Sequence, residues 1–75
     1  MPVKIGDYEV YHNDDVSHGL RYLAGLPEED RNEMFQHAQG ARDHNNHFQA
    51  RIDGRDLRYV LIHNNDGTYT LRPKP

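Results

Sequence analysis

The chain has 75 residues, of which nine are lysine or arginine, 12 are aspartate or glutamate, six are histidine and none is cysteine. This length predicts one small domain over residues 1–75, and the lack of cysteine excludes disulfides and thiol chemistry and favours the cytoplasm. No apolar run approaches the ~20 residues of a membrane span, and the basic residues lack the clustering usual for nucleic-acid binding, so we expect neither kind of partner.

The charge is divided unevenly along the chain. Residues 1–33 hold eight acidic and three basic residues, whereas residues 34–75 hold four acidic and six basic residues. The N-terminal part is therefore acidic and the C-terminal part mildly basic. Protonation of all six histidines would change the net charge from −3 to +3, so the net charge depends strongly on pH where histidine titrates.

The first segment predicts a strand, because its apolar residues alternate with polar ones. These apolar residues are Val3, Ile5, Tyr8 and Val10. Gly6-Asp7 interrupts the alternation, which indicates either a tight hairpin with very short arms or one strand bulged at Gly6. We expect the bulged strand, lying beside the C-terminal sheet.

Two helices are predicted next. Residues 13–15 offer N-caps, and the apolar residues that follow at helical spacing are Val16, Leu20 and Leu23, with Gly25 as a stop. The second helix begins at Pro27 with three acidic residues in its first turn. Its apolar stripe comprises Met34, Phe35, Ala38 and Ala41, and Asn45-Asn46 is expected to end it.

Residues 47–73 predict three strands joined by two tight turns. Asp53-Gly54 lies between two alternating runs, as is typical of a hairpin with a type I′ turn. Residues 65–67 predict a three-residue loop with Gly67 in the left-handed conformation. The expected cross-strand pairs are Arg51–Asp56, Ala50–Leu57, Phe48–Tyr59, Ile62–Thr70, Leu61–Leu71 and His63–Tyr69.

Alternation divides this three-stranded ribbon into two faces. The face expected to form the core carries Phe48, Ala50, Ile52, Leu57, Tyr59, Leu61, His63, Tyr69 and Leu71. The other face carries Gln49, Arg51, Arg58, Val60, Ile62, Thr68, Thr70 and Arg72. The fold class is therefore expected to be α+β: an N-terminal strand, two helices, then a three-stranded antiparallel meander with the helices packed on one sheet face. The last strand, residues 68–72, is expected to be an accessible edge.

The face opposite the core predicts a small non-enzymatic protein-interaction or regulatory module. Its partner-binding residues would be Arg51, Arg58, Val60, Ile62, Thr70 and Arg72, and its partner an acidic or amphipathic protein. Three other interpretations remain: the N-terminal strand covers Val60 and Ile62, a second copy covers them in a homodimer, or β-branched residues simply suit a central strand.

Catalytic residues, metal ligands and cofactors are not predicted. His37 and His44 are seven residues apart, ~10 Å along a helix, which is too far to share a metal ion. The alternative function is a small ribonuclease-like enzyme that uses histidine and arginine on a phosphodiester. His63, however, belongs to the expected core face, so an arginine would have to come from a loop, for example Arg42 or Arg55.

Overall fold

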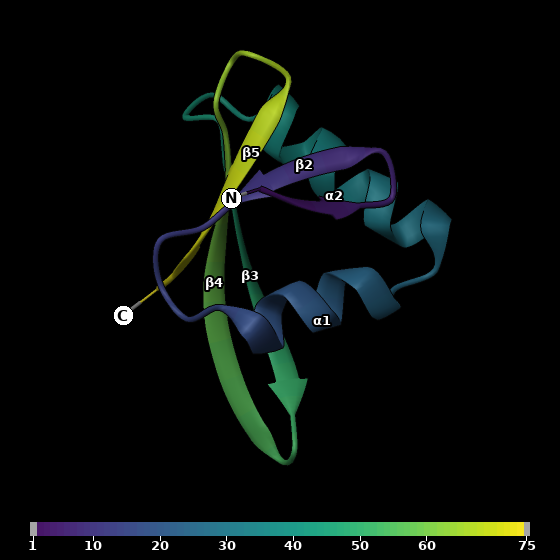
Figure 1. Ribbon diagram of the computed structural model, residues 1–75, viewed down its shortest axis with the longest axis vertical. Coiled ribbons are helices and arrows are strands. Elements are labelled where there is room, and N and C mark those ends of the chain that lie inside the picture. The colour runs from purple at the N-terminus through teal and green to yellow at the C-terminus, as the bar shows by residue number, and fades with distance from the viewer. Residues whose placement is uncertain (1, 75) are drawn as a thin grey trace.

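The computed structural model describes residues 2–74, which form five strands and two helices. In chain order these are β1 (Val3–Ile5), β2 (Tyr8–Tyr11), α1 (Ser17–Gly25), α2 (Glu28–Gly40), β3 (Asn45–Ile52), β4 (Arg55–His63) and β5 (Thr68–Pro73). The strands form one mixed sheet in the order β1-β2-β5-β4-β3 (Figure 1). The α+β class is confirmed. The expected count of one N-terminal strand plus three is wrong, because the sheet has five strands.

The C-terminal meander has the predicted register. Asp53 and Gly54 have φ values of 52° and 78°, as a type I′ turn requires, and Gly67 has a φ of 88°. All six expected cross-strand pairs are present in the β3–β4 and β4–β5 ladders. The sequence patterns were sufficient here because both connections are short and each strand has one apolar face.

The N-terminal segment is a hairpin, so the expected single bulged strand is wrong. The chain reverses at Gly6, whose φ is 60°, and β1 pairs antiparallel with β2. The reversal sets Val3 opposite Val10 and Ile5 opposite Tyr8. All four apolar side chains then share one side of the sheet. A bulge at Gly6 would give the same sidedness, so the alternation alone did not distinguish the hairpin from the bulged strand.

Strand β2 also corrects the expectation that the last strand is an edge. It pairs in parallel with β5, and Val10 lies beside Tyr69 in this ladder. The meander therefore continues into the N-terminal hairpin, and the edges of the sheet are β1 and β3. A parallel pair between the two ends of the chain depends on everything that lies between them, so local patterns could not predict it.

Helix α1 follows its predicted stripe, but α2 ends earlier than expected, so Ala41 of its predicted stripe lies after the helix. Leu23 of α1 is buried, and so is Val16, which directly precedes this helix. Helix α2 ends at Gly40 instead of reaching Asn45-Asn46, and these two asparagines already belong to β3. The turn that joins α2 to β3 includes a left-handed residue, His44, with a φ of 58°. No helix within residues 2–74 has the length and apolar character needed to cross a membrane.

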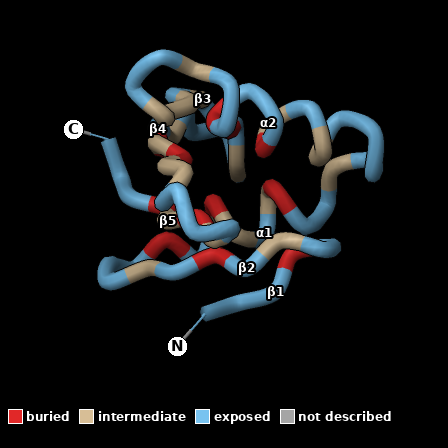
Figure 2. The backbone as a smooth tube through the Cα atoms, turned by 90° about the horizontal axis from the view of Figure 1, so that it is seen from above, coloured by how far each residue is buried: buried red, intermediate tan, exposed pale blue. Residues whose placement is uncertain are grey.

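Both helices pack on the same side of the sheet, and the core lies between them and the strands. Figure 2 shows the buried segments of the strands and helices facing this shared interior. The buried apolar residues are Ile5, Val10, Val16, Leu23, Phe35, Ala38, Ala50, Tyr59, Leu61, Tyr69 and Leu71. Phe35 stacks on Tyr8 with ring centroids 4.1 Å apart and meets Tyr69 edge-on at 4.8 Å. These contacts tie α2 to the parallel pair of β2 and β5.

Candidate functional site

The side of the sheet opposite the helices forms an open face. We use this name for the strand side chains that alternate with the buried ones: Lys4, Glu9, Tyr11, Asn45, His47, Gln49, Arg51, Asp56, Arg58, Val60, Ile62, Thr68, Thr70, Arg72 and Lys74. All six residues predicted to bind a partner belong to this face. The N-terminal hairpin extends the sheet sideways beside β5 and does not cover Val60 or Ile62.

The centre of the open face is apolar and half-buried. Val60 and Ile62 lie on β4, which has a strand on each side, and both keep part of their surface accessible. In the same row as Ile62 lie Thr70 and then Tyr11, whose side chain is 42% exposed. The row therefore presents an aliphatic and an aromatic side chain together on one surface.

Basic side chains lie next to this centre, at the end where Val60 is found. Arg58 and Arg72 are exposed, and Arg72 lies directly beside Val60. Arg51 is further away, towards the turn between β3 and β4, and forms a 3.4 Å ion pair with Asp56. Because both partners of that pair are largely exposed, it contributes little to stability, but it reduces the net charge that Arg51 offers.

Thr70 has a structural partner. Its hydroxyl exchanges hydrogen bonds with the side-chain amide of Asn64, at 3.0 and 3.1 Å, and the same amide donates to Thr68 Oγ1. In the adjoining turn, the Thr68 hydroxyl and N–H both donate to the Asp66 carboxylate. These bonds hold the pKa of Asp66 below its ordinary value. The end of the open face is thus fixed by side-chain hydrogen bonds.

A hollow of about 200 Å³ lies on the open face beside Arg58. It is lined by His47, Phe48, Gln49, Arg58 and Lys74. The Lys74 N–H donates to the Arg58 carbonyl oxygen at 2.9 Å, which continues the β4–β5 ladder past β5. The predicted site omitted His47, Gln49 and Lys74. The register used for the meander could have located them, since His47 pairs with Val60 and Gln49 with Arg58.

Tyr11 was also missed, and no local signal could have found it. Its place on the open face depends on the parallel pairing of β2 with β5, in which Tyr11 aligns with Thr70. That pairing joins residues far apart in sequence. Only the assembled sheet brings Tyr11 to the apolar centre.

His63 lies on the side of the sheet that the helices cover. Its ring centroid is 5.7 Å from that of His44 and 5.2 Å from that of Tyr69. The Nδ1 atoms of both histidines are buried and have no hydrogen-bond partner among the described residues. The arginines of the open face point the other way. Within residues 2–74, no three histidine, aspartate or glutamate side chains converge as metal ligands would.

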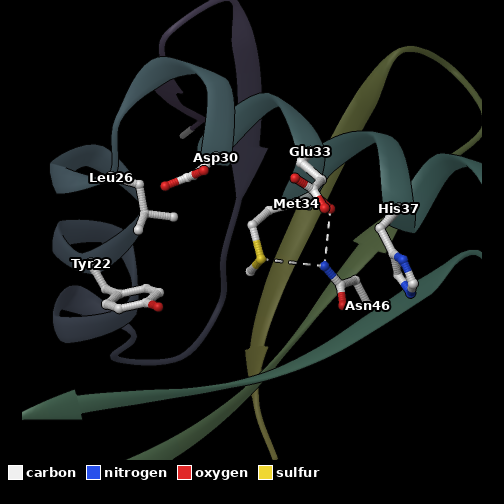
Figure 3. A pocket seen from close by; sticks show the side chains of 7 residues that line it. All are labelled: Tyr22, Leu26, Asp30, Glu33, Met34, His37 and Asn46. Carbon is white, nitrogen blue, oxygen red and sulfur yellow. Dashed lines mark hydrogen bonds between the residues drawn. The ribbon is translucent and has the colours of Figure 1, made fainter.

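A second concavity, of about 370 Å³, lies between α1, α2 and β3 (Figure 3). It is lined by Tyr22, Leu26, Asp30, Glu33, Met34, His37 and Asn46. The Asn46 amide donates to the Met34 carbonyl oxygen at 3.0 Å and lies 3.7 Å from its sulfur, which fixes α2 against β3. The sequence patterns did not predict this groove, because it exists only where two helices and a strand meet.

Comparisons with known proteins do not extend the description of these sites. The sequence matches no protein-family model, and searches of curated proteins and of solved structures find no match.

Proposed function

We propose that the protein is a small non-enzymatic interaction module that binds an acidic, amphipathic protein segment on the open face. The observation that carries this proposal is that Val60, Ile62 and Tyr11 present apolar surface on the side of the sheet opposite the helices, with Arg58 and Arg72 next to Val60. Apolar burial would provide affinity, and the arginines would orient the partner.

Charge complementarity favours an acidic partner. The open face carries five lysines and arginines, and only two carboxylates, Glu9 and Asp56, accompany them. The rest of the molecule has the opposite balance, because the first turn of α2 alone holds three acidic residues. An acidic segment would therefore be attracted to the open face and repelled from the helical side.

The proposal is tested with a short fluorescent peptide that alternates glutamate with valine, titrated with the protein at low ionic strength. Reversal of charge in Arg58→Glu with Arg72→Glu should weaken binding at least about tenfold, since it replaces attraction by repulsion. Val60→Asp with Arg58→Glu should abolish binding while changing the unfolding free energy by ~1 kcal/mol or less, because Arg58 is exposed and Val60 is half-buried on the side opposite the core.

Arg55→Glu provides the matched control. Arg55 belongs to the same strand, β4, and is exposed, but it alternates onto the opposite side of the sheet. The control should bind the acidic peptide like the unmodified protein. Equal losses for Arg55→Glu and for the Arg58 variants, or no loss in either, would contradict the proposal. A lysine-valine peptide that bound equally well would contradict it too.

The hollow beside Arg58 favours the ribonuclease-like alternative through a different histidine from the one expected. His47, Arg58 and Lys74 line one concavity, so an imidazole and two cations face the same space. A phosphodiester there would meet a proton acceptor and positive charge together. Cleavage of labelled RNA by the intact protein, lost in His47→Ala and retained in His63→Ala, would establish this activity; no cleavage by the intact protein would exclude it.

A further inference from the structure

We infer that the outer edge of β3 and the adjoining groove bind an extended peptide segment that carries a lysine or arginine side chain. The peptide would add a sixth strand beside β3 and place its basic side chain between α1 and α2. This site uses the backbone edge of β3 and a groove on the helix side of the sheet, whereas the open face lies on the opposite side. The inference does not depend on the proposed function.

The backbone of β3 offers unpaired hydrogen-bonding groups. Among the described residues, β3 pairs with β4 alone. The His63 N–H donates to the carbonyl oxygen of His44, just before β3, at 2.8 Å. The even-numbered residues of β3 therefore direct their backbone N–H and C=O groups towards β4. In an antiparallel ladder this role alternates, so the N–H and C=O groups of His47, Gln49 and Arg51 point outward.

The two sheet edges differ in how they are protected against an added strand. Strand β1 has only three residues, includes Lys4 and follows Pro2, all of which hinder pairing. Strand β3 has eight residues and contains neither lysine nor proline; Arg51 is its only charged residue. The longer edge therefore has fewer of the features that prevent strand addition, and its outward groups span about five residues, or ~16 Å.

The groove along β3 provides space for side chains of the added strand. Its apolar surface comes from Tyr22, Leu26 and Met34, all half-buried. Tyr22 also stacks on Phe48 of β3 with ring centroids 5.9 Å apart, so the groove floor is continuous with the strand. Alternate side chains of an added strand would point into this groove, because side chains of neighbouring strands project to the same side.

The charges of the groove select a basic side chain. Asp30 and Glu33 are exposed on α2 and line the groove three residues apart on the same helix face (Figure 3). A lysine or arginine stem could lie along Met34 and the ring of Tyr22 while its charged end meets the two carboxylates. An acidic peptide would be repelled at the same place.

A second copy of the chain is a poorer occupant than a basic peptide. Antiparallel pairing of β3 with β3 of another copy would be isologous, so each surface patch near the two-fold axis would face its own counterpart. Asp30 and Glu33 of both copies would then gather over one seam, where like charges repel. The groove thus disfavours self-pairing and favours a partner of opposite charge.

The test uses an isotopically labelled protein and a synthetic peptide that alternates valine and threonine around one central lysine. Titration followed by amide NMR should shift the signals of His47, Gln49 and Arg51 together with those of Tyr22 and Met34. Hydrogen exchange should slow at the amides of the three β3 residues, because the peptide supplies their missing partners. Shifts of His47, Gln49 and Arg51 without shifts of Tyr22 and Met34, or no shifts at all, would overturn the inference.

Two sets of matched variants separate the contribution of charge to peptide binding from that of backbone hydrogen bonding. Asp30→Asn with Glu33→Gln should weaken binding at least about fivefold, since two partly screened ion pairs are lost. Glu28→Gln with Glu29→Gln removes two carboxylates of the same helix outside the groove and should leave the affinity unchanged. Equal losses in both double variants would show attraction to the acidic helix in general and would overturn the site.

Backbone methylation of the peptide tests strand addition itself. Alternate N–H groups of an extended strand point to opposite edges, so N-methylation in one alternating frame should abolish binding and methylation in the other frame should not. Equal behaviour of the two frames would exclude a sixth strand. A doubled mass in solution without peptide, with exchange-protected amides in β3, would show self-pairing and would also overturn the assignment.

Discussion

Gly19 of α1 packs directly against the ring of Tyr59 in β4, so closely that a Cβ atom on Gly19 would lie 3.0 Å from Tyr59 Cε1. The same Cβ atom would lie 3.1 Å from Leu71 Cδ2. Gly19 lies in the first turn of α1. Glycine weakens a helix, so its presence here is explained by the close approach of α1 to the sheet. This contact sets the distance between the helix layer and the centre of the strands.

Gly19→Ala should therefore destabilise the protein by about 1–3 kcal/mol, although alanine favours the helix by about 1 kcal/mol. The added methyl group would push α1 away from Tyr59 and Leu71. Gly25→Ala is the control in the same helix, because a Cβ atom there would meet nothing within 4 Å. Urea denaturation measures the unfolding free energy of both variants. A stabilised Gly19→Ala protein would show that α1 is not held against the sheet as described.

Phe35→Ala should cost about 3–5 kcal/mol, since it removes a fully buried ring. It would also remove the stacking on Tyr8 and the edge contact with Tyr69. We expect most of the protein to be unfolded at room temperature, as judged by circular dichroism, because a chain of this size has little stability to lose. Met34→Ala, a half-buried neighbour on α2, should cost clearly less.

Gly6→Ala and Gly54→Ala should each destabilise the protein by about 1–2 kcal/mol, because both glycines have positive φ values, 60° and 78°, and each substitution forces alanine into the left-handed region. A Cβ atom on Gly6 would lie 3.0 Å from Arg31 Nε, but this atom is near the end of a flexible side chain that can move aside, and Gly54 has open space. Thermal denaturation measures the stability of both variants. Adding Arg31→Ala should leave the cost at Gly6 nearly unchanged, and a large coupling in this double-mutant cycle would contradict a movable arginine.

Acid should weaken the protein through Asp15 and Asp66. Hydrogen bonds from Ser17 and Thr68 respectively hold the pKa of each carboxyl below its ordinary value of 3.8. A lowered folded-state pKa contributes stability above the unfolded value, and this contribution is lost as the pH falls through the folded value. The pKa of Asp66, followed by NMR, should rise towards 3.8 in Thr68→Val and stay unchanged in Asp15→Asn. The Thr68 N–H still donates to Asp66 in this variant, so no movement of the pKa in Thr68→Val would exclude the threonine hydroxyl as a cause.

The part of the open face that comes from β3, β4 and β5 was predictable, because the meander is a local structure. Each hairpin pairs residues close in sequence, and the turns at Asp53-Gly54 and Gly67 set the register on both sides of β4. Alternation then assigned Val60 and Ile62 to the side opposite the core. His47 follows from the same register, so its omission was a failure to extend a correct pattern.

The groove beside β3 was not predictable from the same patterns. Tyr22 and Asp30 belong to different helices, and the angle between these helices is decided by packing against the sheet. The edge status of β3 also depends on β2, which occupies the only free side of β5. Local sequence favoured β5 as the edge because the distant N-terminal hairpin could not be placed.

The amino-acid sequence alone determined the helices, the meander and its register, and the polarity of each strand face, since all of these depend on contacts between near neighbours. The tertiary structure decided the rest. It folded residues 3–11 into a hairpin, paired β2 with β5 in parallel, and left β3 as the long edge beside an acidic groove. The physical reason is burial: Tyr8, Phe35 and Tyr69 leave water together only when both ends of the chain meet under α2.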